Sequence, residues 1–132
     1  MNKKFENILE AIYEKDQRYK PDAYEFALEA LSFTQKKLRR LKHVTGTELL
    51  EGVKELLMER YGPLALSVLR HWGIETTEDF GHIVFNLVGN KILSKSEEDN
   101  IESFRQGYDL EEVFQRGYRK RLEKRISRMR AF

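Results

Sequence analysis

Apolar residues recur at intervals of three and four along most of the chain, and this spacing is typical of amphipathic α-helices. A first helix is predicted near the N-terminus, where one face carries Phe5, Ile8, Leu9, Ile12 and Tyr13. A second is predicted over residues 22 to about 41, because Pro21 suits the first turn of a helix. Apolar residues cover most of the circumference of this second segment, so we expect it to lie centrally and to pack on more than one side.

Residues 45–90 contain the start and stop signals of three further helices. Thr45 stands three residues before Glu48, which is the spacing of a capping box. Gly62 is suited to end that helix, and Gly73 to end the next one. A pair of threonines then precedes two acids, a pattern that favours the start of a helix. The predicted helices cover residues 47–61, 64–72 and 77–90.

Residues 92–108 lack a sustained helical period and are rich in Ser, Asn, Asp and Gly, so they are compatible with a β-hairpin, a loop or a short helix begun by Ser96. Three helices followed by a hairpin is the order of elements in a winged helix-turn-helix. In that arrangement the residues facing a DNA groove would be His82, Asn86, Asn90 and Lys91. Acids in the third helix and the candidate wing would oppose phosphate binding, so the sequence favours the winged-helix shape over DNA recognition by this helix.

The helical period returns at Leu110 and continues to Met129, with apolar residues on one stripe. The other faces are strongly basic and carry Arg116, Arg119, Lys120, Arg121, Lys124, Arg125, Arg128 and Arg130. Gly117 lies inside this segment and weakens the expectation of an unbroken helix. We therefore predict a helical domain over residues 1–115 and, continuous with it, a basic amphipathic helix over residues 116–132.

The placement of charge is more informative than its total. The net charge is only +2, yet residues 1–29 hold seven acids, whereas residues 116–130 hold eight Lys or Arg and one Glu. A second basic cluster ends the second predicted helix and comprises Lys36, Lys37, Arg39 and Arg40, with Lys42 and His43 after them. Cations at a helix C-terminus are favoured by the macrodipole, so this cluster has a structural explanation as well as a binding one.

Composition supports one globular, cytoplasmic domain. A chain of 132 residues with 40% hydrophobic and 35% charged residues can bury a core and present a charged exterior. The absence of Cys excludes disulfides and thiolate chemistry and suits a reducing compartment. No apolar run reaches the roughly 20 residues of a membrane span. Together the patterns predict a single, mainly α domain of five or six helices, winged-helix-like in the middle, with one small β-hairpin near residues 92–108.

One helix carries a polar set that could be a site. Asp79, His82 and Asn86 lie three and four residues apart and therefore share a face. A solvated helix face is the favoured explanation, because one Asp–His pair without a third helical ligand is a weak metal signal. Nucleophile elbows, phosphate-binding loops and dinucleotide fingerprints are absent from the sequence, so neither a metal nor a cofactor is predicted.

Several segments resemble the pattern of a small uncharacterised bacterial protein family first catalogued in Verrucomicrobia and Planctomycetes. They read HVTGTELLEG, YGPLALSVLRHWGIETTEDFGHIVFNLV, LSKSEEDN and SFRQGYDLEEVF, and the resemblance covers about residues 22–115. It implies a family identity but no activity. It also implies a polar family site formed by Asp79, His82, Asn86, Tyr108 and Asp109. A structural role is favoured for it, in which Asp79 caps its helix and meets the Gly-Tyr-Asp segment, while Gly81 permits close helix packing.

Three functional hypotheses follow, and they belong to different classes. The leading one is a non-enzymatic protein that binds RNA or a ribonucleoprotein surface through residues 116–130, together with residues 36–43. The alternative is a protein-interaction or oligomerisation module in which the C-terminal helix packs against a partner helix. The third is an enzyme of unknown class with a site near Asp79, His82 and Tyr108.

Overall fold

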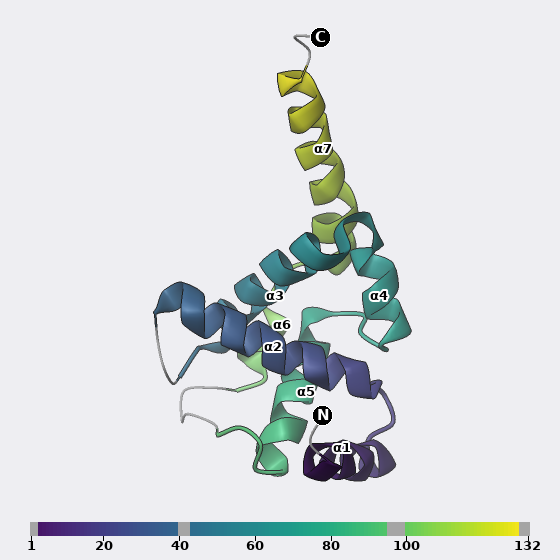
Figure 1. Ribbon diagram of the computed structural model, residues 1–132, viewed down its shortest axis with the longest axis vertical. Helices are drawn as coiled ribbons and strands as arrows, with labels where there is room; N and C mark the ends of the chain where they lie inside the picture. Colours follow the sequence, from purple (N-terminus) through teal and green to yellow (C-terminus); the bar gives the residue numbers. More distant parts are fainter. Residues whose placement is uncertain (1–2, 40–42, 95–99, 130–132) are drawn as a thin grey trace.

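The computed structural model describes residues 3–39, 43–94 and 100–129, and it is mainly α-helical (Figure 1). No strand occurs within these ranges. The predicted single, mainly α domain of five or six helices is confirmed, α6 being a single turn. The elements are α1 (Lys3–Lys15), α2 (Pro21–Leu38), α3 (Gly46–Tyr61), the 3-10 turn η1 (Gly62–Leu64), α4 (Ala65–His71), α5 (Thr77–Gly89), α6 (Glu102–Arg105), the π turn η2 (Glu112–Arg116) and α7 (Gly117–Arg128).

The helix boundaries follow the local signals in the sequence. The Thr45 hydroxyl accepts a hydrogen bond from the Glu48 N–H at 3.1 Å, and the Glu48 carboxylate accepts one from the Thr45 N–H at 3.0 Å, so the predicted capping box is confirmed. α2 ends at Leu38, three residues before the predicted end, because Arg39 adopts a left-handed conformation with φ of 56°. Gly73 has φ of 90°, a value that favours glycine, and it follows α4 as predicted.

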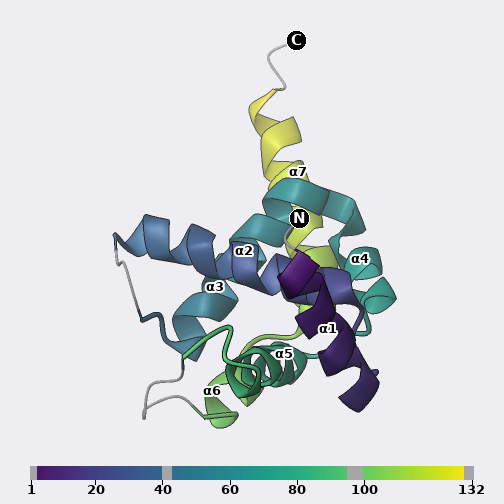
Figure 2. The same ribbon diagram turned by 60° about the horizontal axis from the view of Figure 1, so that its bottom comes forward.

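The core is formed where α2 crosses α3 and where α5 lies beneath both. Figure 2 shows α5 nearly end-on, with α1 and α6 on different sides of it and α2 and α3 above. Its residues Phe80, Gly81, Ile83 and Leu87 are all buried. α5 is therefore a central element, which the sequence predicted only for α2.

The predicted β-hairpin near residues 92–108 is wrong for the described part of this stretch. The chain leaves α5 in a tight turn through Lys91, and after Asn100 it forms α6 instead of a strand. α6 is held by Phe104, whose side chain packs directly on Gly46 and Gly81. The contact is so close that a Cβ at either glycine would come within 3.0 Å of the Phe104 side chain. Residues 95–99, which include three of the acids expected in the wing, lie outside the described residues.

The winged-helix prediction is also unsupported. A recognition helix must present one face to solvent, but α5 packs against α2, α3 and α6, and Gly89 is its only exposed residue, the others being buried or half-buried. Asn86 illustrates the difference, since its amide donates to Asp16 in the connection between α1 and α2 and to Tyr24 of α2. The close packing that was expected around Gly81 is present, with α6 as the neighbouring helix.

The C-terminal helix is continuous through Gly117 and projects from the body. The Gly117 N–H donates to the Glu112 carbonyl, five residues back, and closes the π turn η2. Leu110 and Phe114, which precede or belong to this turn, are buried in the core. Beyond it, Leu122, Ile126 and Met129 are 41%, 55% and 70% exposed. The apolar stripe predicted from Leu110 to Met129 is thus buried only in its first part, and Figures 1 and 2 both show α7 extending away from the other helices.

Candidate functional site

A cluster of four hydrogen-bonded side chains joins α5 to the connection between α1 and α2. Arg18 donates two hydrogen bonds to the Asp16 carboxylate, from Nη2 at 2.7 Å and from Nε at 2.9 Å. The Asn86 amide nitrogen donates to the same carboxylate at 2.9 Å and to the Tyr24 hydroxyl at 3.0 Å. We call Asp16, Arg18, Tyr24 and Asn86 the polar cluster. It fastens the N-terminal helices to the central helix of the fold.

Asp79 lies seven residues before Asn86 on α5 and serves a similar structural purpose. Its Oδ2 accepts from the backbone N–H groups of Glu75 and Thr76 at 2.8 and 3.0 Å, which stabilises the start of the helix. Its Oδ1 accepts from the hydroxyl of the buried Tyr19 at 2.5 Å. Burial and the hydrogen bond to Asp79 raise the pKa of Tyr19 well above its ordinary value. The predicted capping role of Asp79 is confirmed.

The five residues of the predicted polar family site do not form one site. Tyr108 donates to the Leu50 carbonyl on α3 at 2.6 Å, and burial raises its pKa. Asp109 accepts from the Glu112 N–H at 2.9 Å and so caps the last helix. The side chain of His82 makes no hydrogen bond or ion pair within the residues that the structure describes. The Gly-Tyr-Asp segment meets α5 at Thr77 and not at Asp79, because Gly107 lies so close to Thr77 that a Cβ there would come within 2.8 Å of its side chain. The Thr77 hydroxyl itself donates to the Phe104 carbonyl of α6 at 2.6 Å.

The arrangement of these groups is that of a folded scaffold. Within the described ranges, every buried side-chain nitrogen and oxygen atom has a hydrogen-bond partner. In a site for acid–base chemistry or ligand binding, some of these groups would instead have unused hydrogen-bond donors or acceptors directed into a pocket. The residues that the sequence analysis missed, Asp16, Arg18, Tyr19 and Tyr24, complete the scaffold. No motif identifies them, because the partners of Asp16, Tyr19 and Tyr24 on α5 lie 60 to 70 positions away, and Arg18 joins the cluster only through Asp16.

The pH dependence of stability tests the polar cluster. The guanidinium of Arg18, and after it the Asn86 amide, hold the pKa of Asp16 well below its ordinary value despite partial burial. The ionised carboxylate therefore stabilises the folded state above its unfolded pKa of about 4, and this contribution is lost as pH falls. We expect Asp16→Asn to lower the free energy of unfolding by about 1–2 kcal/mol at pH 7, with a difference from wild type that shrinks below about pH 4. Urea unfolding across this pH range measures it.

Glu10→Gln provides the matched control, because Glu10 is an exposed acid of α1 without a hydrogen bond in the described chain. It should change stability by less than about 0.5 kcal/mol at either pH. An Asp16→Asn effect that stays constant down to pH 2 would show that the carboxylate charge is not what stabilises the cluster.

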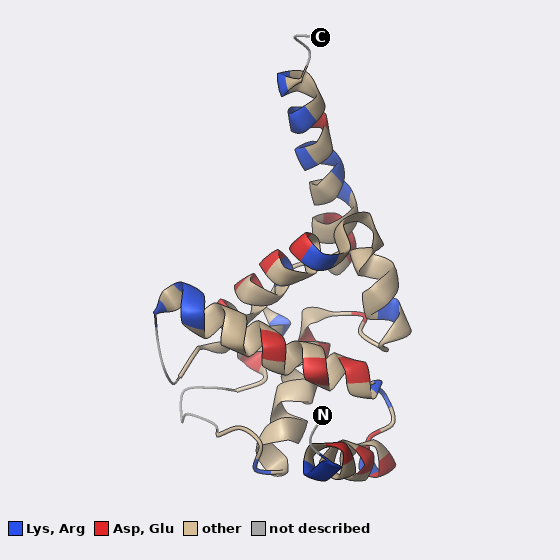
Figure 3. Cartoon of the chain, viewed as in Figure 1, with Lys and Arg blue, Asp and Glu red and all other residues tan. Residues whose placement is uncertain are grey.

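The predicted basic surface at the C-terminus is present on α7. This helix holds six Lys or Arg and one Glu, a net charge of +5, whereas the whole chain carries +2, so the rest of the chain has a net charge of −3. Figure 3 shows the basic residues along α7 and acidic residues on α1, α2 and α3. The charge is thus concentrated on the one element that projects from the body.

Neighbouring basic side chains of α7 fall on one arc of the helix. Residues three and four positions apart share a face, which groups Lys120, Arg121, Lys124, Arg125 and Arg128. We call these five residues the basic arc. Four of them, all except Lys120, line a hollow of about 440 Å³ together with Met58, Tyr118 and Leu122. The aromatic ring of Tyr118 also contacts Gly62, at the end of α3.

The basic arc has no acidic partners in the described chain. Arg116, Arg119 and the five arc residues are exposed and form no ion pair there, whereas cations of the body do: Arg18 with Asp16, Lys37 with Glu55, Lys54 with Glu51, Arg60 with Glu29, and Arg105 with Glu78 and Glu102. Within the described part of the chain, the positive charge of α7 is therefore not neutralised by ion pairs.

The second predicted basic cluster lies elsewhere. Lys36 and Lys37 are in the last turn of α2 and Arg39 caps it, while Arg40 lies outside the described residues. Figure 3 places this end of α2 apart from α7, with the acidic residues of α3 between them. Lys37 is paired with Glu55 of α3. The structure thus does not join the two clusters into one continuous surface.

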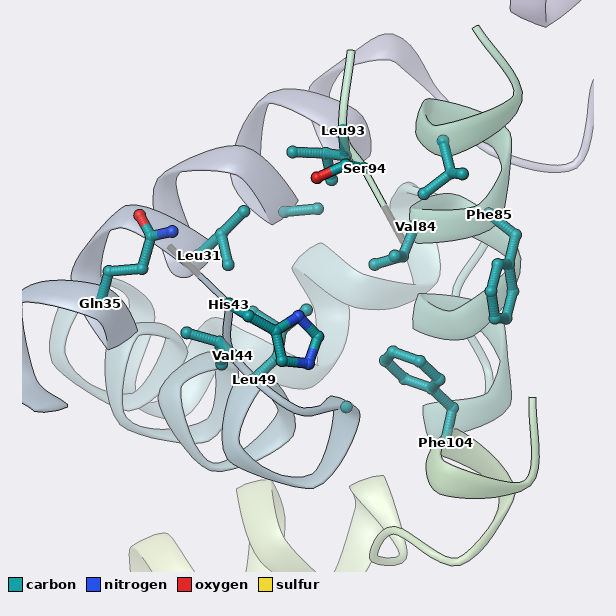
Figure 4. Close-up of a pocket in the computed structure, with 13 residues that line it drawn as sticks. Leu31, Gln35, His43, Val44, Leu49, Val84, Phe85, Leu93, Ser94 and Phe104 are labelled. Atoms are coloured by element: carbon teal, nitrogen blue, oxygen red, sulfur yellow. The ribbon is translucent and has the colours of Figure 1, made fainter. Parts of the chain in front are cut away.

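A mostly apolar cavity of about 590 Å³ opens between α2, α5 and the start of α3 (Figure 4). Sequence analysis did not identify it, because its walls combine ordinary helix stripes from segments far apart in the chain. Its lining includes Ala27, Leu31 and Gln35 of α2, Val84, Phe85 and Val88 of α5, and Phe104 of α6. His43, Val44 and Leu49 come from the chain that leads into and forms α3.

Two further observations concern function classes. Among the described residues, no three His, Asp or Glu side chains are grouped so that they could hold a metal ion, and no helix is long and apolar enough to cross a membrane. No family model, curated protein or solved structure matches the chain. The resemblance to the bacterial family described above stays a prediction.

Proposed function

We propose that the protein binds nucleic acid through α7, with the basic arc contacting the phosphate backbone and RNA as the preferred partner. The observation that carries this proposal is the concentration of unpaired cations on a projecting helix whose own body is acidic. A polyanion that neutralises them releases condensed counterions, which is the main source of affinity in backbone-dominated binding. The acidic body would keep the same polyanion from spreading over the rest of the surface.

The chemistry of the basic arc favours backbone contacts over base reading. All five of its side chains are Lys or Arg, and α7 contains no Asn or Gln for bidentate contacts to adenine. α5, the helix in the recognition position of the winged-helix hypothesis, has Gly89 as its only exposed residue. Arginine-rich segments are a common means of binding structured RNA. We therefore expect weak dependence on sequence and strong dependence on salt.

The direct test removes the charge of the arc without shortening the chain. The variant Arg121→Gln/Lys124→Gln/Arg125→Gln/Arg128→Gln should bind a labelled RNA hairpin at least tenfold more weakly at about 50 mM salt, measured by fluorescence anisotropy. Its plot of log affinity against log salt should be shallower by up to about 3 units if each lost cation corresponds to one phosphate contact.

The matched control removes four exposed cations from elsewhere: Lys3→Gln/Lys15→Gln/Lys20→Gln/Arg70→Gln. Both variants change the net charge equally, so a loss confined to the arc variant identifies a local surface. Equal losses would point to net charge alone, and no binding by the wild type at low salt would refute the proposal. A duplex DNA arm tests the preference for RNA, which requires tighter binding of the hairpin.

A second candidate function rests on the exposed part of the apolar stripe. Leu122, Ile126 and Met129 lie at i, i+4 and i+7, so they form a narrow seam of the kind used in helix pairing. As the alternative, we propose that α7 pairs with a helix of a partner or of a second copy. Light scattering separates the candidates, because self-association requires a molar mass that rises with protein concentration in the absence of nucleic acid.

A further inference from the structure

The hollow beside the basic arc contains apolar side chains that contacts to phosphate do not use. Met58 comes from the last part of α3, and Tyr118 and Leu122 come from the first half of α7, where they lie four residues apart and share a face. Figures 1 and 2 both show the end of α3 beside the start of α7. The hollow of about 440 Å³ therefore lies where the two helices meet, and its volume is within the range of small-molecule sites.

The apolar part of the lining is anchored to the body. Met58 is half-buried and packs against the hydrophobic core. The Tyr118 ring lies beside Gly62 at the end of α3, where an added Cβ would meet it at an ordinary contact distance of 3.5 Å. Phe114, four residues before Tyr118, is buried in the core and holds the start of α7 against the body. The position of the Tyr118 ring beside α3 is thus determined by the fold.

Tyr118 differs from the buried tyrosines in what its side chain contacts. The hydroxyl groups of Tyr19, Tyr24 and Tyr108 are all hydrogen-bonded within the protein. Tyr118 is half-buried, and within the described residues its hydroxyl makes no hydrogen bond and its ring makes no aromatic or cation–π contact. The ring and the hydroxyl of Tyr118 are therefore available to a ligand in the hollow.

The chemistry of the lining indicates a ligand with a flat ring and an anionic group. An aromatic ring, a thioether and an aliphatic side chain are joined there by four cations, Arg121, Lys124, Arg125 and Arg128. A nucleotide combines a planar base with a phosphate. Unstacked bases pack on aromatic rings and on the planes of Arg side chains. Because every base has a π face, such stacking accepts any of the four bases.

The structure of RNA decides which of its nucleotides can enter the hollow. In a fully paired helix the bases are stacked on one another, and the deep, narrow major groove is closed to side chains. A nucleotide in a bulge or a loop can instead turn its base outward, while the phosphates on either side of it stay on the basic arc. Only RNA with an unpaired nucleotide would thus use the apolar and the basic residues of the hollow together.

We propose that the hollow holds the base of an unpaired nucleotide, with Tyr118 as its stacking partner, so that α7 prefers RNA with a bulge or a loop. This inference rests on the proposed function of α7 and names the class of RNA that it binds. It agrees with a weak dependence on sequence, because the hollow distinguishes an unpaired base from a paired one and not one base from another.

The test compares three RNA hairpins with the same stem: one with a single bulged adenosine, one with an abasic nucleotide in the bulge, and one fully paired. The abasic bulge carries the same phosphates as the bulged adenosine, so the difference between these two hairpins isolates the base. We expect the full chain to bind the hairpin with the bulged adenosine at least about fivefold more tightly than the abasic hairpin. Fluorescence anisotropy at about 50 mM salt measures the affinities.

Tyr118→Ala should bind the bulged-adenosine and abasic hairpins equally well, with an unchanged dependence on salt, because it removes no cation. Tyr118→Phe retains the ring and should retain the preference. Tyr13→Ala is the matched control, since Tyr13 is 38% exposed on α1 and lies outside the hollow. It should leave the preference of the wild type unchanged.

The outcomes separate this inference from the proposed function. Equal binding of the bulged-adenosine and abasic hairpins by the wild type would overturn the inference and leave the proposed function of α7 intact, whereas no binding of any hairpin would refute both. This comparison needs no variant, so it decides even if Tyr118→Ala does not fold. A preference that persists in folded Tyr118→Ala would overturn the stacking role of Tyr118. Binding of AMP as tight as that of the bulged-adenosine hairpin would assign the hollow to free nucleotides and overturn its assignment to RNA.

Discussion

Replacing Gly52 with alanine is expected to lower the free energy of unfolding by about 3 kcal/mol, although alanine is the better helix former. The reason lies in the closest approach of α2 and α3. A Cβ at Gly52 would lie 1.7 Å from the Thr34 hydroxyl oxygen and 3.0 Å from its Cβ. Thr34 is buried and donates to the Ala30 carbonyl at 2.7 Å, so it has little freedom to move aside. For a chain of this size the melting temperature should fall by about 10 °C.

A compensating substitution makes this prediction specific. Thr34→Ala removes the hydroxyl that meets the new methyl group, so the double variant Gly52→Ala/Thr34→Ala should recover more than half of the lost stability. Gly89→Ala is the control, because a Cβ at this helical glycine meets no atom within 4 Å. It should be neutral or stabilising by up to about 1 kcal/mol. No recovery in the double variant would mean that the strain at Gly52 has another source.

Asp79→Ala is expected to lower the free energy of unfolding by about 2–3 kcal/mol and to leave any nucleic-acid affinity of α7 unchanged. The substitution removes the acceptor for two backbone N–H groups at the start of α5, an effect of about 1 kcal/mol. It also leaves the buried Tyr19 hydroxyl without its acceptor, which adds about 1–2 kcal/mol. Chemical unfolding and RNA anisotropy on the same samples measure the two readouts.

Tyr19→Phe and His82→Ala separate the components. Tyr19→Phe removes only the hydroxyl group and should lower the free energy of unfolding by about 1 kcal/mol. In its background the cost of Asp79→Ala should be smaller, because no hydroxyl is left unpaired. His82→Ala should change stability by less than about 1 kcal/mol, since no hydrogen bond is lost. If Asp79→Ala were stable but abolished a binding activity, the residue would be functional and not structural.

Elements defined by local chemistry could be predicted from the sequence. The capping box at Thr45 and the left-handed Gly73 depend on residues a few positions apart, and both are observed. The segment between α5 and α6 was predicted poorly because it has one large anchor, Phe104, and no repeating apolar pattern. The glycines that receive this anchor are 58 and 23 positions earlier, so the fit of Phe104 between them is visible only in three dimensions.

The candidate sites show the same division between features set by neighbouring residues and features set by residues far apart in the sequence. The charge on α7 is a property of a contiguous segment, and the sequence predicted it in full. That its apolar stripe would be buried up to Phe114 and exposed from Leu122 could not be predicted, because burial depends on where the body ends. The polar cluster and the cavity combine side chains from separate helices, and a helix stripe alone does not indicate whether its neighbour fills the space beside it.

The π turn between the body and α7 determines the direction in which the basic arc faces around the axis of α7. A helix turns by about 100° and rises about 1.5 Å for each residue. The wider turn over Glu112–Arg116 contains about one residue more than an α-helical turn, and Phe114 within it is anchored in the core. Deleting one residue here would shorten the helix by only about 1.5 Å. It would also rotate the basic arc by about a quarter of a turn around the helix axis. The direction in which the protein presents its positive charge is thus encoded in the length of one turn, separately from the residues that carry the charge.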